Sequence, residues 1–403
     1  YCLYFKIAGL TIRVKFSTHS SIRLTLNLYE PHQSIQVDFK SPPTIITSCW
    51  LLFKHLIRGN QLMHLIRSLF PPGARRYFCL AGIAVFLIAH LTGCAYHRHF
   101  EGAYAGPEPV PESVSRIYMY SKYEGPYTSE TLECHETYEI EKISFNTAQG
   151  PLNDSHQMTM IYYKRRQPGK TPVVVVLPIL GGRYRIARSF AGHFAESGYA
   201  ALLVHRQKSY KENLGMENVD QTLKQIVIDH KLVLDWVETR PELDAERIGV
   251  FGVSMGSIKA SLLTALDDRV SAAILGLVAG DLPYVLAYSS EPGIKKKRNA
   301  YMKAHQMTQD DLYQALKDRV ECDPMNYAEY LNAEAVMMIL GRFDTVMPYR
   351  KGLEMWEKIG KPEKITILSG HVTAYPMIPY IKEMAMEFYK KQFEDLNSGP
   401  CRN

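Results

Sequence analysis

The sequence predicts an α/β protein with a mostly parallel, doubly wound sheet, antiparallel strands at its N-terminal edge and a helical cap insertion. Apolar strand patterns alternate with helical patterns over about the last 230 residues, which is typical of a parallel sheet covered on both faces. The run "TPVVVVLPIL" at residues 171–180 is continuously apolar, as in a strand buried on both faces. Period-two alternation begins near residue 113 and indicates antiparallel strands before that run.

The elements follow in order along the chain. The antiparallel strands are predicted at residues 115–123, 137–145 and 157–166, with turn residues at 148–155. Later strands are predicted at 171–180, 199–205, 247–252, 270–280, 335–341 and 364–369, and helices at 183–198, 218–240, 257–266 and 380–394. A polar, largely helical insertion at about 282–334 interrupts the sheet. We expect it to be a lid over the substrate pocket, with a peripheral helical excursion as the alternative.

The N-terminal part of the chain is not expected to be a domain. Residues 1–62 show no sustained helical or strand period and precede the first methionine, Met63. We therefore expect them to be an over-extended reading frame or a disordered extension. The catalytic domain is expected at residues 113–395, followed by a tail at 396–403.

Residues 63–93 have the pattern of a secretory signal. A basic leader precedes an uncharged apolar run at 78–93, which is shorter than the ~20 residues of a bilayer span. The tetrad "LTGC" then ends at Cys94 and resembles the lipobox of bacterial lipoproteins. That resemblance implies a diacylglyceryl thioether on Cys94, a linker at 94–112 and a lipid-anchored position in the bacterial cell envelope, facing the periplasm or exterior. An uncleaved signal anchor is the alternative.

Charge argues against a nucleic-acid partner. The formal net charge is +6, but residues 1–93 hold ten Lys and Arg against two acids, so residues 94–403 carry about −2. The basic cluster Lys295, Lys296, Lys297 and Arg298 is expected to be a solvated face, with contact to anionic lipid headgroups as the alternative. Cys134 and Cys322 are expected either to form a disulfide or to remain unpaired thiols.

One serine stands at a predicted strand-to-helix junction. The stretch "GVFGVSMGSIKA" places Ser254 between Gly252 and Gly256, directly after a strand and before a helix. A tight turn there strains the backbone and projects the serine oxygen above the sheet, near the positive end of the helix dipole. The flanking glycines allow strand and helix to approach closely. These features predict that Ser254 is a nucleophile.

A serine hydroxyl needs a base and an orienting acid, and both should lie at the carboxyl ends of neighbouring strands. Asp344, in "MMILGRFDTVMP", follows one buried strand, and His371, in "ITILSGHVTAY", follows the next. The chain order is therefore Ser, Asp, His. Ser254, Asp344 and His371 are predicted to converge at one edge of the sheet.

These motifs carry a family resemblance. Residues from about 113 to 395 resemble the α/β-hydrolase superfamily, and most closely its dienelactone-hydrolase, acetyl-esterase and prolyl-peptidase-like branch. The resemblance implies Ser254 as nucleophile, His371 as general base and then acid, and Asp344 as its orienting carboxylate. Many members have a glycine where this chain has Ser257.

Acyl transfer also needs donors for the oxyanion. The backbone N–H of Met255 is one candidate. The other is expected from the loop after the first long buried strand, where Pro178 cannot donate and either Ile179 or Leu180 can.

Other polar residues are weaker candidates for the acid and the base. Asp281 also follows a strand, in "LVAGDLPY", and is the alternative acid. His193 and His230 lie within predicted helices, where a solvated or packed histidine is expected. His205 ends a strand that precedes the nucleophile, so it could at most line the pocket.

The sequence thus predicts a membrane-tethered serine hydrolase that acts on small-molecule carboxylic esters. It shows no metal-ligand spacing and no glycine-rich phosphate loop, so no cofactor is expected. The first alternative is a peptidase or amidase of prolyl-peptidase type. The second is a lipoprotein that keeps the fold as a binding or structural module without catalysis.

Overall fold

The chain forms two compact units, Tyr1–Ile88 and Ala89–Asn403. The computed structural model describes residues 2–7, 10–17, 21–27, 34–40, 95–101, 104–152, 155–181, 184–207, 210 and 215–398, with side chains described between residues 95 and 394. Residues 63–94, which include the predicted signal segment and Cys94, lie outside the described residues. None of the described helices is both long enough and apolar enough to cross a membrane.

The first unit contains a four-stranded antiparallel sheet that the sequence analysis did not predict. Its strands are β1 (Cys2–Ile7), β2 (Leu10–Ser17), β3 (Ser21–Asn27) and β4 (Ser34–Lys40), in that order. The signal was present, because "LTIRVKFS" alternates apolar and polar residues with period two. The register also sets Ile12 opposite Leu26, and Leu24 opposite Val37. The expectation that residues 1–62 lack a strand period is therefore wrong for these segments.

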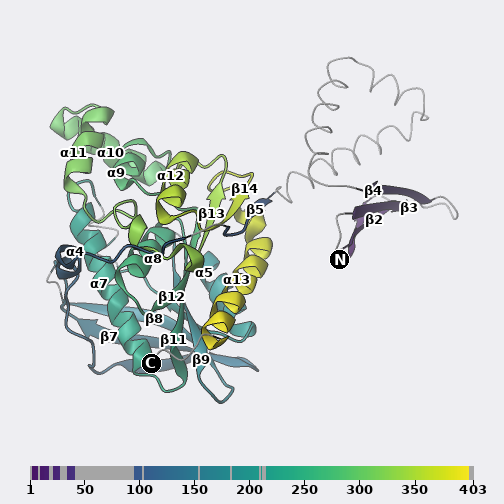
Figure 1. Ribbon diagram of the computed structural model, residues 1–403, viewed down its shortest axis with the longest axis horizontal. Coiled ribbons are helices and arrows are strands. Elements are labelled where there is room, and N and C mark those ends of the chain that lie inside the picture. The colour runs from purple at the N-terminus through teal and green to yellow at the C-terminus, as the bar shows by residue number, and fades with distance from the viewer. Residues whose placement is uncertain are drawn as a thin grey trace. The chain divides into compact units, whose positions relative to one another are not determined.

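The second unit is built on one ten-stranded sheet (Figure 1). Its order is β5 (Ala95–Arg98), β14 (Glu363–Ile367), β13 (Val336–Gly341), β12 (Val270–Gly276), β11 (Leu243–Val253), β9 (Thr171–Leu177), β10 (Ala200–Val204), β8 (His156–Arg165), β7 (Tyr138–Thr147) and β6 (Thr128–Cys134). The strands from β14 to β10 are parallel, and the others are antiparallel. The predicted mixed sheet with antiparallel N-terminal strands is confirmed.

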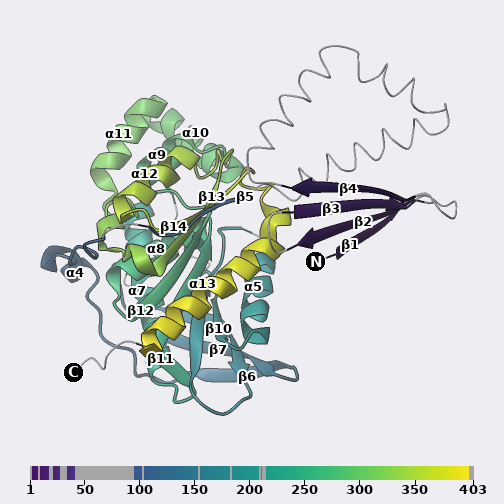
Figure 2. The ribbon, with the colours of Figure 1, turned by 45° about the vertical axis from the view of Figure 1, so that its right-hand side comes forward.

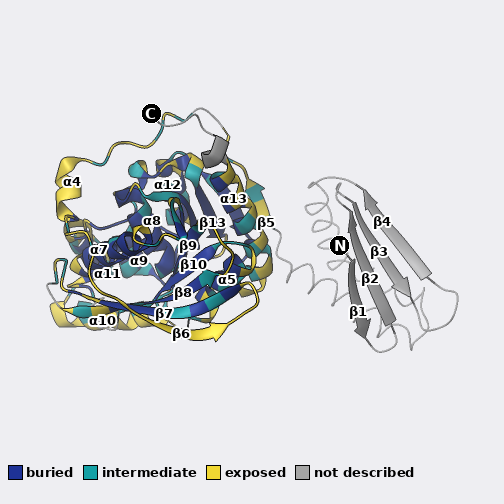
Figure 3. Cartoon of the chain, turned by 90° about the horizontal axis from the view of Figure 1, so that it is seen from below, coloured by how far each residue is buried: buried dark blue, intermediate teal, exposed yellow. Residues whose placement is uncertain are grey.

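Helices cover both faces of this sheet, which explains the continuous apolar strands. On one face lie α7 (Val219–Glu238), α8 (Met255–Leu266) and α12 (Tyr349–Ile359), and on the other lie α5 (Arg185–Glu196) and α13 (Ile378–Ser398) (Figure 2). Val173 and Val175 belong to the first core, whereas Val174 and Val176 belong to the second. Figure 3 shows these central strands buried between the helices. Because successive side chains point to opposite faces, every buried position of β9, from Val173 to Leu177, has an apolar residue.

Two segments differ from the predicted elements. Residues 115–123 do not form a strand, because helix α4 (Glu112–Ile117) occupies their start and β6 is the edge strand instead. Pro111 directly precedes the helix and is a helix-start signal. Glu112 and Arg116 form an ion pair 2.6 Å long across one helical turn. These two signals outweigh the alternation of apolar and polar residues in this segment. Helix α12 was not predicted, and α13 continues to Ser398, into the predicted tail.

The segment predicted as a linker is partly docked on the second unit. β5 pairs with β14 directly after Cys94. Further on, the Tyr104 hydroxyl donates to the carbonyl of Leu331 at 2.9 Å, and the N–H of Glu108 donates to the carbonyl of Glu329 at 2.8 Å. These contacts leave no long free spacer between position 94 and the sheet.

The insertion forms helices α9 (Leu282–Tyr288), α10 (Pro292–His305) and α11 (Gln309–Arg319), followed by short turns η1 (Ala328–Tyr330) and η2 (Ala333–Ala335). It packs on the loop after β13, where the Ser289 hydroxyl donates to the carbonyl of Val346 at 2.8 Å. Arg298 is buried and donates to the carbonyl of Ser289 at 3.0 Å, so it does not belong to a solvated face. Lys295, Lys296 and Lys297 are exposed.

Cys134 and Cys322 are both free thiols. Cys134 lies on the exposed edge strand β6, whereas Cys322 is buried and accepts a hydrogen bond from the Tyr118 hydroxyl at 3.1 Å. Burial raises the pKa of the Cys322 thiol well above its ordinary value. The disulfide considered from the sequence is therefore not formed.

Candidate active site

Ser254 occupies a strained turn between β11 and α8. Its φ of 57° lies in the left-handed region, which non-glycine residues rarely adopt. The strand side is held by a 2.8 Å hydrogen bond from the N–H of Ser254 to the carbonyl of Gly276. The helix side is held by Ser257, whose N–H and hydroxyl donate to the Ser254 carbonyl at 2.9 and 2.6 Å. The residue that departs from the usual glycine pattern thus supports the turn.

The two glycines of the motif are required by close packing. A Cβ at Gly252 would collide with the carbonyl of Gly256, and a Cβ at Gly256 would collide with the carbonyl of Leu177 at the end of β9. The close approach at Gly252 closes the turn between β11 and α8. The close approach at Gly256 brings α8 against the loop that follows β9, so this loop lies beside the nucleophile position.

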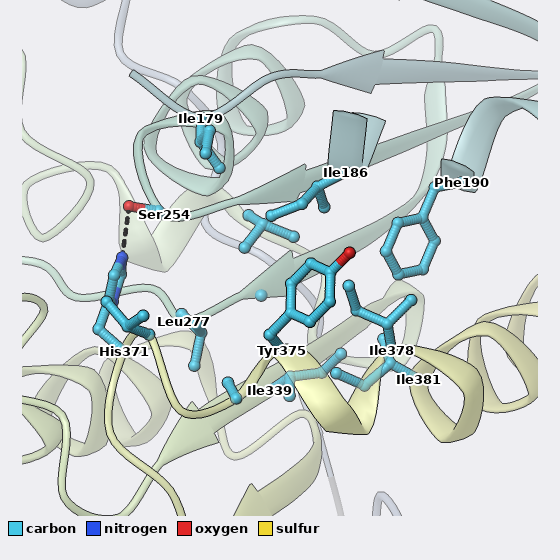
Figure 4. A pocket seen from close by; sticks show the side chains of 14 residues that line it. Ile179, Ile186, Phe190, Ser254, Leu277, Ile339, His371, Tyr375, Ile378 and Ile381 are labelled. Carbon is cyan, nitrogen blue, oxygen red and sulfur yellow. Dashed lines mark hydrogen bonds between the residues drawn. The ribbon is translucent and has the colours of Figure 1, made fainter. Parts of the chain in front are cut away.

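His371 reaches Ser254 from the loop after β14. Its Nε2 atom lies 2.9 Å from the Ser254 hydroxyl oxygen, as the dashed line in Figure 4 shows. Its Nδ1 atom lies 2.7 Å from Oδ2 of Asp344. Because a carboxylate only accepts, the network assigns the proton to Nδ1 and leaves Nε2 to accept from the serine hydroxyl.

Asp344 follows β13 and is 5% exposed. Its Oδ1 atom accepts the backbone N–H groups of Val346 at 2.8 Å and Met347 at 2.9 Å. These two donors fix the carboxylate and leave Oδ2 for the imidazole. The structure therefore brings together the three side chains that the sequence placed 90 and 27 residues apart.

The competing residues have other partners. Asp281 accepts from the N–H of Tyr284 at 3.1 Å and pairs with Nζ of Lys351 at 2.8 Å, so it caps α9. His205 stacks on Tyr184 with ring centroids 4.5 Å apart, and burial lowers its pKa to about 4. His230 is buried in α7, where its Nδ1 pairs with the carbonyl of Ile226 at 2.5 Å and burial lowers its pKa to about 3. His193 lies within α5, and burial lowers its pKa.

Two backbone N–H groups near Ser254 are candidate donors to an oxyanion. Met255 is the first residue of α8, so its N–H has no acceptor within the helix. Ile179 lines the same cavity as Ser254. Its N–H belongs to the peptide bond that carries the Pro178 carbonyl, and Nζ of Lys259 lies 3.5 Å from that oxygen. Because N–H and C=O point in opposite directions across a trans peptide, this contact directs the Ile179 N–H away from Lys259.

Two cations that the sequence analysis did not single out hold this loop. Lys259 on α8 is buried, and burial together with the charge of Arg206 lowers its pKa to about 7. The Arg206 guanidinium donates to the carbonyl of Leu180 and lies 4.7 Å from the ring centroid of Tyr184. The available signal for Lys259 was its position as the one charged residue in the apolar helix "SIKASLLTAL".

A cavity of about 300 Å³ opens beside Ser254 and His371 (Figure 4). Its walls come from α5, from the ends of β11, β12 and β13, and from the segment after β14. None of the described residues of the insertion lines it. Apart from Ser254, His371 and Tyr375, the lining side chains are apolar: Ile179, Ile186, Phe190, Val253, Leu277, Ile339, Val372, Ala374, Ile378 and Ile381.

A separate cluster contains three potential metal ligands that the residue spacing in the sequence did not reveal. His97, His99 and Glu363 offer donor atoms within 4.8 Å of one another at the β5–β14 edge, and Nε2 of His97 lies 2.7 Å from Oε1 of Glu363. Two imidazoles and a carboxylate form a donor set that zinc accepts. The sequence concealed the cluster because Glu363 lies 266 residues from His97.

Part of the chain is similar to a known sequence family. Residues 158–276, which include Ser254, match the family model described as "Dienelactone hydrolase family". The Bacillus subtilis (strain 168) protein named "Putative hydrolase YtaP" is 26% identical over 167 residues. That match covers 34% of this chain and 55% of YtaP, so it spans about half of the relative's length.

Two solved structures share the fold. The acetyl xylan esterase from Paenibacillus sp. R4 is 20% identical, with a TM-score of 0.51 over 70% of this chain and 99% of that one. Acetyl Xylan Esterase 1 from Thermoanaerobacterium sp. JW/SL YS485 is 18% identical, with a TM-score of 0.53 over 72% and 96% of the two chains. At this level of identity the likeness concerns the arrangement of the chain.

Proposed function

We propose that this chain is a serine hydrolase of the α/β-hydrolase superfamily that cleaves carboxylic esters through an acyl-enzyme intermediate. The match to the dienelactone hydrolase model and the fold shared with two acetyl xylan esterases support the proposal. The observation that carries the proposal is the hydrogen-bonded chain from Ser254 through His371 to Asp344, with distances of 2.9 and 2.7 Å. This arrangement gives the hydroxyl a base, and gives the base a fixed tautomer.

Acylation begins when Oγ of Ser254 attacks the ester carbonyl carbon and its proton passes to Nε2 of His371. Asp344 stabilises the imidazolium that forms. The carbonyl oxygen becomes an oxyanion and accepts the N–H groups of Met255 and Ile179. Of the two loop donors considered from the sequence, Ile179 is favoured over Leu180 because the Lys259 contact fixes its peptide.

The tetrahedral intermediate then collapses. The bond from carbon to the alcohol oxygen breaks, and Nε2 of His371 returns its proton to the leaving alkoxide, which departs as the alcohol. In deacylation, His371 removes a proton from water as the water attacks the acyl carbon. The same proton then returns to Oγ of Ser254, and the carboxylic acid leaves.

Labelling with a fluorophosphonate tests the nucleophile. The wild-type protein is expected to be labelled and Ser254→Ala is expected to lose labelling, because no other hydroxyl contacts Nε2 of His371 among the described residues. Ser261→Ala is the matched control, since its hydroxyl donates to the carbonyl of Ile258 within α8. Equal labelling of wild type and Ser254→Ala would remove Ser254 as the nucleophile.

Hydrolysis rates then separate the classes of reaction. We expect p-nitrophenyl esters to be cleaved faster than proline-containing amides. Preference for the amides would support the peptidase alternative, and binding without turnover or labelling would support the non-catalytic module.

Membrane attachment is a second proposal, and it rests on the sequence. The basic leader, the short apolar run and "LTGC" support lipidation of Cys94 and a position in the bacterial cell envelope. β5 starts one residue later, at Ala95. An anchor at Cys94 would therefore hold the edge of the sheet close to the bilayer surface.

A further inference from the structure

The shape and lining of the cavity beside Ser254 favour some esters over others. This inference rests on the proposed function. We propose that the cavity is an acyl site for apolar acyl groups of about six to ten carbons, well above acetyl in size. Its walls offer few polar groups beyond Ser254, His371 and the Tyr375 hydroxyl. A sugar or a charged acyl group would lose its hydration there without replacement hydrogen bonds.

The size of the cavity sets the length of the acyl group. An apolar protein cavity of roughly 150 Å³ holds benzene, with six carbons. A cavity of about 300 Å³ therefore holds at most roughly twice as many carbon atoms, and acyl groups of about six to ten carbons lie within that limit. An acetyl group would leave most of this space empty, so the substrate would gain little from burial.

The position of the cavity assigns it to the acyl side. The ends of β11, β12 and β13 form its wall next to Ser254, through Val253, Leu277 and Ile339. Val372, the chain neighbour of His371, also lines the cavity and is 81% exposed, so the cavity opens to solvent at the loop that carries His371. The acyl group stays bound to Ser254 until water attacks, whereas the alcohol must leave past His371 after taking its proton. The inner part of the cavity, lined by Leu277 and Ile339, therefore suits the acyl group, and its open end at the His371 loop suits the departing alcohol.

The far end of the cavity identifies a residue that limits chain length. Figure 4 shows Ile378 and Phe190 at the end away from Ser254. Ile378 is half-buried at the start of α13, so a larger side chain there can extend into the cavity without replacing a core residue.

The test measures kcat/KM of the full chain on p-nitrophenyl acetate, butyrate, hexanoate and octanoate, each below its solubility limit. Each buried methylene is expected to raise kcat/KM about fourfold, so hexanoate, with four more methylenes, should exceed acetate by about 250-fold. A second series keeps the acyl group short and lengthens an aliphatic alcohol, and there the rates should change little.

Ile378→Trp provides the structural test. It is expected to lower kcat/KM on octanoate at least about tenfold and to leave acetate within about threefold. Ile117→Trp is the matched control, because Ile117 lies on the exposed face of α4 and does not line the cavity. Fluorophosphonate labelling of both variants at the wild-type stoichiometry establishes that Ser254 remains reactive.

The outcomes separate this inference from the proposed function. Labelling of Ser254 with equal rates on acetate and octanoate would overturn the acyl site and leave the serine hydrolase intact. Rates that rise with the alcohol chain instead of the acyl chain would assign the cavity to the alcohol and also overturn the inference. Loss of both labelling and ester cleavage would overturn the proposed function, and the acyl site with it.

Discussion

Ser254 adopts a strained backbone conformation, and its neighbours explain why the strain persists. A non-glycine residue in the left-handed region costs on the order of 1–3 kcal/mol. The bonds to Gly276 on one side and from Ser257 on the other hold the turn closed. The same turn places the hydroxyl 2.9 Å from His371. The strain therefore lies at the residue where a fixed hydroxyl position is needed.

Replacing Asp344 by Asn tests the orientation of the imidazole. An Asn side-chain amide would donate to Nδ1 of His371, so the ring proton would move to Nε2, which could no longer accept from Ser254. We expect kcat for ester hydrolysis to fall by about 10⁴-fold. The measurement is steady-state hydrolysis of the preferred ester, with circular dichroism as the check on folding.

Asp281→Asn is the control for that experiment. Asp281 caps α9 and pairs with Lys351, so its replacement should change kcat by only a few-fold. A large loss in Asp281→Asn together with a small loss in Asp344→Asn would assign the acid role to Asp281 instead.

Among the elements, helix α8 has two roles. It presents Ser254 at its N-terminus, and it buries the ammonium of Lys259 beside the loop that carries Ile179. Burial lowers the pKa of Lys259 to about 7 from 10.5. Near pH 7 and below, the folded protein therefore contains a buried positive charge that the unfolded chain exposes to water.

The pH dependence of stability tests this burial. Between about pH 7 and 10.5 the unfolded state binds more protons at Lys259 than the folded state, so the free energy of unfolding should rise with pH. The slope contributed by this group is at most about 1.4 kcal/mol per pH unit. Below pH 7 both states are protonated and the contribution is constant. Lys259→Met should therefore show a smaller rise, measured by denaturant unfolding from pH 6.5 to 9.5.

Lys296→Met is the matched control, since Lys296 is exposed on α10. Its unfolding free energy should follow the wild-type pH profile. An unchanged profile in Lys259→Met would show that the Lys259 ammonium is not perturbed by burial.

The whole chain combines a near-neutral catalytic unit with a basic N-terminal region. The proposed lipid anchor at Cys94 is testable by incorporation of radiolabelled palmitate in a bacterial host that processes lipoproteins. The full chain should be labelled, and Cys94→Ser should lose the label because the thioether cannot form. Cys134→Ser is the matched control, since Cys134 is an exposed free thiol on β6. Palmitate retained in Cys94→Ser would exclude this cysteine as the anchor.

Sequence reasoning recovered most of the second unit because its signals are local. The apolar run of β9 and the helical spacing of α7 each fit one element. The errors have local causes as well. Residues 115–123 alternate like a strand, yet Pro111 and Glu112 start a helix there. The alternation in residues 10–17 was present but was not recognised.

The sequence by itself determined most of the strands and helices of the second unit, the strained serine turn and the choice of Ser254, Asp344 and His371 as candidates. Those features follow from short-range patterns of residue size, polarity and backbone preference. Only the tertiary structure decided that Asp344 contacts His371 while Asp281 contacts Lys351, that Lys259 is buried beside Pro178, and that an apolar cavity opens at Ser254. These facts depend on distances between residues far apart in the chain, which are set by how the strands and helices pack together.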